Sequence, residues 1–144
     1  MLILLYNLVR KNDLIHYKIS AMKSQGLSAI ERKKLYESLV ATNPKALLKG
    51  ATIPYTSVNG NMYSYLSKDG FVALRLDEVT RNELMKKYKA TLALSYGIIQ
   101  KEYVHVPDSL LVKTNELKYY FNKSYEYASS LKPKKPAIKK AKKS

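Results

Sequence analysis

The sequence contains no cysteine and no tryptophan, and it has only two histidines, His16 and His105. Without cysteine the chain can form no disulfide and no thiolate metal site, and it has no thiol nucleophile. This composition is typical of a reducing compartment, so we expect a cytoplasmic protein. The two histidines lie too far apart in the sequence for the usual spacing of metal ligands. We therefore expect neither a metal nor another cofactor.

Catalytic motifs are also missing. The chain has five glycines, and none belongs to a phosphate-binding loop, a dinucleotide fingerprint or a nucleophile elbow. Asp77 and Glu78 precede a predicted helix, whose N-terminus favours negative charge. The alternative hypothesis, that the protein is a small enzyme with an unrecognised site, would need a concave pocket that joins Glu102, His105 and a tyrosine. We expect no catalytic residues and a protein that is not an enzyme.

Long apolar runs are missing as well. Residues 1–9 are apolar apart from Asn7, and this run is too short to span a bilayer. Arg10 and Lys11 follow the run, whereas a signal peptide has its basic residues before the apolar segment. We expect residues 1–21 to be an extension outside the fold. The alternative is a short amphipathic helix that lies on the domain or on a membrane surface. Met22 then begins a single domain, residues 22–131.

Charge of one sign dominates, since the formal net charge is +15. Residues 132–144 contribute +7 and residues 1–21 contribute +2, so +6 remains for residues 22–131. The tail has little apolar surface to bury and many like charges, which predicts disorder over residues 132–144. Its basic residues are the candidate nucleic-acid contacts: Lys132, Lys134, Lys135, Lys139, Lys140, Lys142 and Lys143.

Local signals define the first half of the domain. A capping box at Ser28–Glu31 predicts a helix over residues 28–41, which ends before Pro44. Asn59-Gly60 is a strong signal for a tight hairpin turn between strands at 53–58 and 61–66. A further turn at 68–70 leads into a strand at 71–76, in which Val72, Leu74 and Leu76 share one apolar face.

The second half repeats the pattern. Thr80–Glu83 has the form of another capping box and predicts a helix whose apolar stripe includes Leu84. Strands at 91–95 and 99–106, a helical turn at 108–111 and a helix over 114–130 follow. On the strand at 99–106, His105 lies on the face opposite Val104 and Val106. The sequence therefore predicts an α+β fold, an antiparallel sheet of about five strands with helices packed on one face, in the order α-β-β-β-α-β-β-α.

Several strings in this order resemble the TfoX N-terminal domain family, the module of the Sxy-like competence regulators. The resemblance covers residues 48–131 and depends on the strings at 58–63, 71–81 and 101–107. The chain departs from the family at residues 49–54, where members usually have a Met-Phe-Gly-Gly-like step. The resemblance implies an α+β domain without known catalysis, associated with transcriptional regulation in some members. It supplies no active-site residues.

Two functions from different classes follow as hypotheses. The first is a non-enzymatic binding or regulatory module that acts through protein contacts, with another protein or a second copy of itself as partner. The second is a nucleic-acid-associated protein that binds through its lysine-rich tail, because flexible lysines neutralise phosphates without sequence preference. We expect no membrane partner. A bare apolar patch on the folded domain would favour the first hypothesis.

Overall fold

The computed structural model describes residues 26–135. The predictions for residues 1–21 and for Lys139, Lys140, Lys142 and Lys143 lie outside these residues. The described chain contains helices α2 (Ala29–Ala41), α3 (Glu78–Tyr88), α4 (Asp108–Leu111) and α5 (Thr114–Ser130), and strands β1 (Tyr55–Val58), β2 (Asn61–Leu66), β3 (Val72–Arg75), β4 (Thr91–Ser95) and β5 (Ile98–His105). This order confirms the predicted α+β class, with α4 as the helical turn expected at 108–111.

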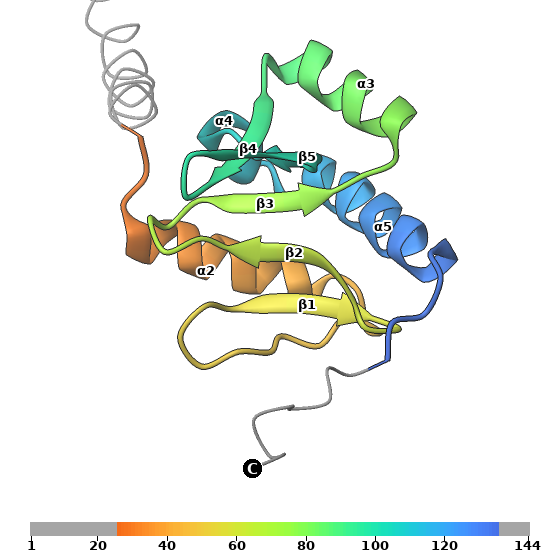
Figure 1. Ribbon diagram of the computed structural model, residues 1–144. Coiled ribbons are helices and arrows are strands. Elements are labelled where there is room, and N and C mark those ends of the chain that lie inside the picture. The colour runs from red at the N-terminus through yellow and green to blue at the C-terminus, as the bar shows by residue number, and fades with distance from the viewer. Residues whose placement is uncertain (1–25, 136–144) are drawn as a thin grey trace, which may run out of the picture.

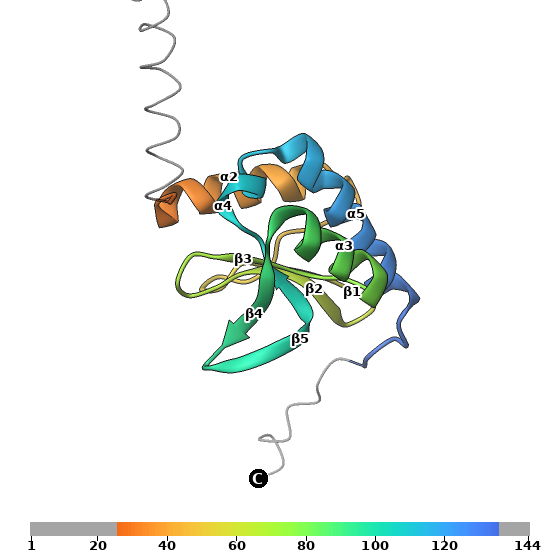
Figure 2. The same cartoon turned by 90° about the horizontal axis from the view of Figure 1, so that it is seen from above.

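The strands form one antiparallel sheet in the order β1-β2-β3-β5-β4 (Figure 1). Helices α2, α4 and α5 lie on one side of this sheet, α3 lies beside β5 at one end of the strand order, and the far end of the β4–β5 hairpin bends away to the other side (Figure 1, Figure 2). As predicted for β3, Val72 and Leu74 face the helices and are fully buried, and Leu76 continues the same row. His105 lies on the opposite face from Val104 and Val106, which confirms the alternation expected for β5.

The β1–β2 turn has the backbone that Asn59-Gly60 predicts, with φ of 54° and 76°. Beyond it, the register shifts by one residue, because Thr56 pairs with Ser64 whereas Ser57 pairs with Met62. The extra residue is Tyr63, which this β-bulge turns toward the helices. Its ring packs against α5, 5.7 Å from the ring of Phe121 and 5.6 Å from that of Tyr125.

The same bulge creates a buried group of hydroxyls between α2, β1 and β2. The Tyr36 hydroxyl lies 2.7 Å from Ser64 Oγ, and Thr56 Oγ1 lies 2.5 Å from the same atom. The Tyr63 hydroxyl is buried and has no hydrogen-bond partner within the described chain. A buried hydroxyl without a partner costs free energy, so this group is a weak point of an otherwise apolar core.

The two predicted capping boxes have different outcomes. The first is present: Ser28 Oγ accepts from the Glu31 amide at 3.1 Å, and the Glu31 carboxylate accepts from the Ser28 amide at 3.0 Å. The second is wrong, because α3 begins three residues earlier than expected. Asp77 is its N-cap and accepts from the Thr80 amide at 3.2 Å, since a carboxylate caps a helix better than a threonine and comes first along the chain.

Residues 132–135, which the sequence assigned to the disordered tail, lie along the β1–β2 turn. The Lys134 amide donates to the Asn59 carbonyl at 2.8 Å, and Asn61 Nδ2 donates to the Lys132 carbonyl at 3.1 Å. A Cβ at Gly60 would lie 2.3 Å from the Lys134 carbonyl oxygen, so only glycine permits this approach. The folded part therefore extends four residues further than the composition indicated.

Candidate functional site

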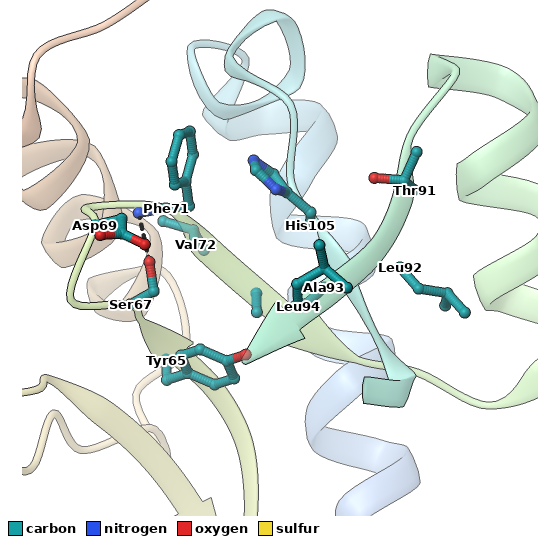
Figure 3. A pocket seen from close by; sticks show the side chains of 11 residues that line it. Tyr65, Ser67, Asp69, Phe71, Val72, Thr91, Leu92, Ala93, Leu94 and His105 are labelled. Atoms are coloured by element: carbon teal, nitrogen blue, oxygen red, sulfur yellow. Dashed lines mark hydrogen bonds between the residues drawn. The ribbon is translucent and has the colours of Figure 1, made fainter. Parts of the chain in front are cut away.

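The open face of the sheet is hollowed between the β2–β3 turn and β4 (Figure 3). This sheet hollow has a volume of about 240 Å³. Three rings, those of Tyr65, Phe71 and His105, surround it, with Leu94 on the hairpin side and Asp69 on the turn side (Figure 3). A second hollow of about 450 Å³ shares Tyr65, Asp69 and Leu94 with the first and continues toward the tip of the β4–β5 hairpin.

His105 is the one histidine within the described chain, and it borders the sheet hollow. Its ring centroid lies 4.5 Å from that of Phe71, at an interplanar angle of 53°. Burial lowers the pKa of His105, and this effect outweighs the opposing influence of the nearby Asp108 carboxylate. The imidazole is therefore neutral at pH 7 and acts here mainly as part of the aromatic wall.

An ion pair lies behind this aromatic wall. Arg32 Nε donates to Asp108 Oδ1 at 2.9 Å and its Nη2 donates to Oδ2 at 3.0 Å, while the Leu27 amide also donates to Oδ2 at 2.8 Å. The guanidinium carbon lies 4.4 Å from the centre of the Phe71 ring. Burial alone would raise the pKa of Asp108, but the hydrogen bonds from Arg32 and Leu27 outweigh it and lower the pKa. This arrangement fixes α2 against α4 and holds Phe71 in place.

Glu102 belongs to a different cluster. It accepts from Arg75 Nε at 2.7 Å and from the Tyr127 hydroxyl at 2.8 Å, toward the C-terminal end of β3. The burial of Glu102 raises its pKa, but these hydrogen bonds outweigh that effect and lower it. The sheet hollow thus brings His105 and Tyr65 together without Glu102. The constellation that the enzyme alternative required is not assembled in the described chain.

The β4–β5 hairpin is irregular. Leu92 pairs with Val104 of β5, but the next residue, Ala93, pairs with Gln100, so residues 101–103 have no partner on β4. A bulge of this size bends the hairpin sharply, which explains why its far end leaves the plane of the sheet (Figure 2). The bend also forms the hairpin side of the sheet hollow.

The far end of this hairpin is apolar and exposed. We call its four large exposed side chains the hairpin patch: Leu94 (63% exposed), Tyr96 (94%), Ile98 (66%) and Ile99 (57%). Leu94 and Ile99 are cross-strand partners, so they stand side by side on one face of the hairpin. Sequence reasoning missed this patch because apolar residues in a predicted strand indicate burial. The signal was the run from residue 90 to residue 100, which contains no charged residue.

The turn of this hairpin is strained. Tyr96 and Gly97 occupy its two central positions with φ of 51° and 75°. Asn59-Gly60 adopts nearly the same φ values in the β1–β2 turn, with the residue types that such turns favour. A tyrosine in the left-handed region is an outlier for a bulky residue. Since Tyr96 is almost fully exposed, packing within the described chain does not explain its presence.

The lysines predicted as nucleic-acid contacts are only partly described. The side chains of Lys132, Lys134 and Lys135 are exposed beside the β1–β2 turn. Within residues 26–135, no three histidine or acidic side chains cluster closely enough to hold a metal ion. The same part of the chain contains no helix that is long and apolar enough to cross a membrane.

Comparison with known proteins adds no further evidence about this site. The chain matches no family model, no curated protein and no solved structure.

Proposed function

We propose that this domain is a non-enzymatic binding module that acts through protein contacts, and that the β4–β5 hairpin makes those contacts. The observation that carries the proposal is the hairpin patch, whose four large apolar side chains project from the domain. Leu94 and Ile99 stand side by side on one face of the hairpin, and exposed apolar patches mark interaction sites in soluble proteins.

The strained turn gives independent support. Residues held in sparsely populated backbone conformations cluster at functional sites. Tyr96 combines such a backbone with 94% exposure at the tip of a projecting element. Tyrosine is also enriched among the residues that dominate binding energy at protein interfaces.

Site-specific photo-cross-linking tests this proposal. Tyr96 is replaced with the photoreactive amino acid p-benzoylphenylalanine, and the protein is irradiated in cells. Tyr119, 49% exposed on α5, receives the same replacement as the matched control. Discrete protein adducts from position 96 that are absent from position 119 are expected. No adduct from position 96, or the same adducts from both positions, would contradict the proposal.

The tail supports a second function, contact with nucleic acid. Residues 132–144 carry seven lysines and no acidic residue, and the three described ones among them are exposed. Flexible lysines bind phosphates by counterion release, and that binding weakens steeply with salt. The two functions are compatible, because Lys132 and Lys134 lie beside the β1–β2 turn whereas the hairpin patch lies at the tip of a different hairpin.

The resemblance to the TfoX N-terminal domain family stays a prediction. It implies an α+β domain, and a regulatory module that binds a protein partner would fit it. The cytoplasmic location is likewise a proposal, based on the absence of cysteine.

A further inference from the structure

The two edges of the sheet differ in how they are protected. Beside β1, the Lys49 amide donates to the Tyr55 carbonyl at 2.8 Å and the Tyr55 amide donates to the Lys49 carbonyl at 2.9 Å. Lys49 Nζ also donates to Ser57 Oγ at 3.0 Å, which places a charge along this edge. A covering segment and an edge lysine are both ways in which proteins prevent strand addition.

The other edge, β4, has neither protection within the described chain. Its residues Thr91–Ser95 pair with β5 on one side only. The strand contains no proline and no charged residue, although 26% of the residues in the chain are charged. An uncharged open edge presents unpaired backbone groups that can accept a further strand.

The charge of the chain indicates which partner the edge accepts. A chain with a net charge of +15 repels a second copy of itself wherever lysine-rich surfaces meet. Residues 90–100 are free of charge, so two copies can bring this surface together without placing like charges in contact. An acidic partner, in contrast, would be attracted to the lysines rather than to this neutral edge.

The geometry also suits an identical partner. An antiparallel pair of β4 strands is related by a two-fold axis, and each strand then offers the same backbone donors and acceptors that it needs from the other. The hairpin patch borders this edge, since Leu94 belongs to β4 itself. Pairing along β4 would therefore cover exposed apolar side chains as well as backbone groups.

We infer that β4 is the interface of a homodimer, in which a second copy of this chain pairs antiparallel along β4 across a two-fold axis. This inference rests on the proposed function, because it names the protein that the hairpin binds. It assigns the association to the strand edge, with the hairpin patch as the apolar part of the interface.

Light scattering after size-exclusion chromatography, over a concentration series of the full chain, tests the inference. We expect twice the 16.5 kDa mass of the chain at high concentration. Leu94→Lys should weaken the dimer by roughly a hundredfold, because both copies lose an apolar contact and gain a charge. Val79→Lys is the matched control: Val79 is 76% exposed on α3, and its replacement should leave the dimer unchanged.

Hydrogen exchange separates edge pairing from contact at the hairpin tip alone. Those amides of residues 91–95 that point away from β5 should exchange more slowly as the dimer forms, and circular dichroism should show equal folding of all three proteins. A monomer at every concentration, a dimer that resists Leu94→Lys, or β4 amides that gain no protection would each overturn the inference. If the chain is a monomer but position 96 cross-links to other proteins, the inference fails and the proposed function stands. If neither association occurs, both fail.

Discussion

Tyr96→Asn should stabilise the fold and weaken association at the same time. Tyrosine at φ of 51° carries a steric cost of about 1 kcal/mol, which asparagine largely avoids in this region. The tyrosine ring is 94% exposed, so its removal takes almost no packing from the domain. The free energy of unfolding should therefore rise by about 0.5–1 kcal/mol.

This gain converts to a measurable shift in Tm. The unfolding entropy is about 2.1 cal/mol/K per residue, taken over the roughly 110 described residues. Dividing the gain in free energy by this entropy gives an expected rise in Tm of roughly 2–4 °C. Calorimetry measures the shift, and light scattering measures association of the same sample. Association should weaken about tenfold, as expected for the loss of an aromatic contact.

The β1–β2 turn provides the reciprocal control. Asn59→Tyr places the same ring at φ of 54° on the other hairpin, where it should lower the free energy of unfolding by about 1 kcal/mol and leave association unchanged. A loss of stability in Tyr96→Asn would mean that the ring packs on the domain. A gain in stability with unchanged association would mean that the ring contacts no partner. Either result refutes the reasoning.

Three further predictions concern the core and the tail. Asp108→Asn should cost about 2–3 kcal/mol, because Arg32 loses its charged partner in a site where both side chains are less than a fifth exposed. The pKa of Asp108 is lowered in the fold, so its contribution to stability is complete above the pKa that it has in the unfolded chain and disappears as pH falls through the pKa that it has in the fold. The stability of the variant, measured by urea titration, should therefore depend less on acid pH. Tyr63→Phe should leave urea stability unchanged or raise it, whereas Tyr36→Phe should lower it by about 1 kcal/mol, since the Tyr36 hydroxyl is hydrogen-bonded and that of Tyr63 is not. Ending the chain after residue 135, which retains the described fold, removes four of the seven tail lysines and should weaken duplex DNA binding and lower its salt dependence in a titration; equal binding by both chains would exclude residues 136–144 as the contact.

Signals that depend on neighbouring residues predicted the architecture well. The Ser28 capping box, the Asn59-Gly60 turn and the alternation of apolar residues in β3 each act within a few residues, and each is present as expected. The start of α3 was misplaced because two cap signals compete there. Asp77 precedes Thr80, and the earlier and stronger cap determines where the helix begins.

The features of the candidate site depend on long-range contacts and could not be predicted in the same way. The bulge that directs Tyr63 into the core is a one-residue shift in the register between two strands, and no residue type in either strand indicates it. The ion pair behind the sheet hollow joins Arg32 to Asp108, which are 76 residues apart. The contact between residues 132–135 and the β1–β2 turn likewise joins segments whose compositions indicate nothing about each other.

The contrast between the two hairpins separates the stability of this domain from its function. The β1–β2 hairpin has the favoured turn residues, an inward-facing tyrosine and a covering segment at its tip, so its side chains contribute to folding. The β4–β5 hairpin has a strained turn, outward-facing apolar side chains and an open edge, although the two turns have nearly the same φ values. Because the backbone demands are the same, the different side chains cannot be attributed to turn formation. Substitutions at the β4–β5 tip should therefore change what the protein binds while the fold stays intact, which is the property that makes the proposed interface experimentally accessible.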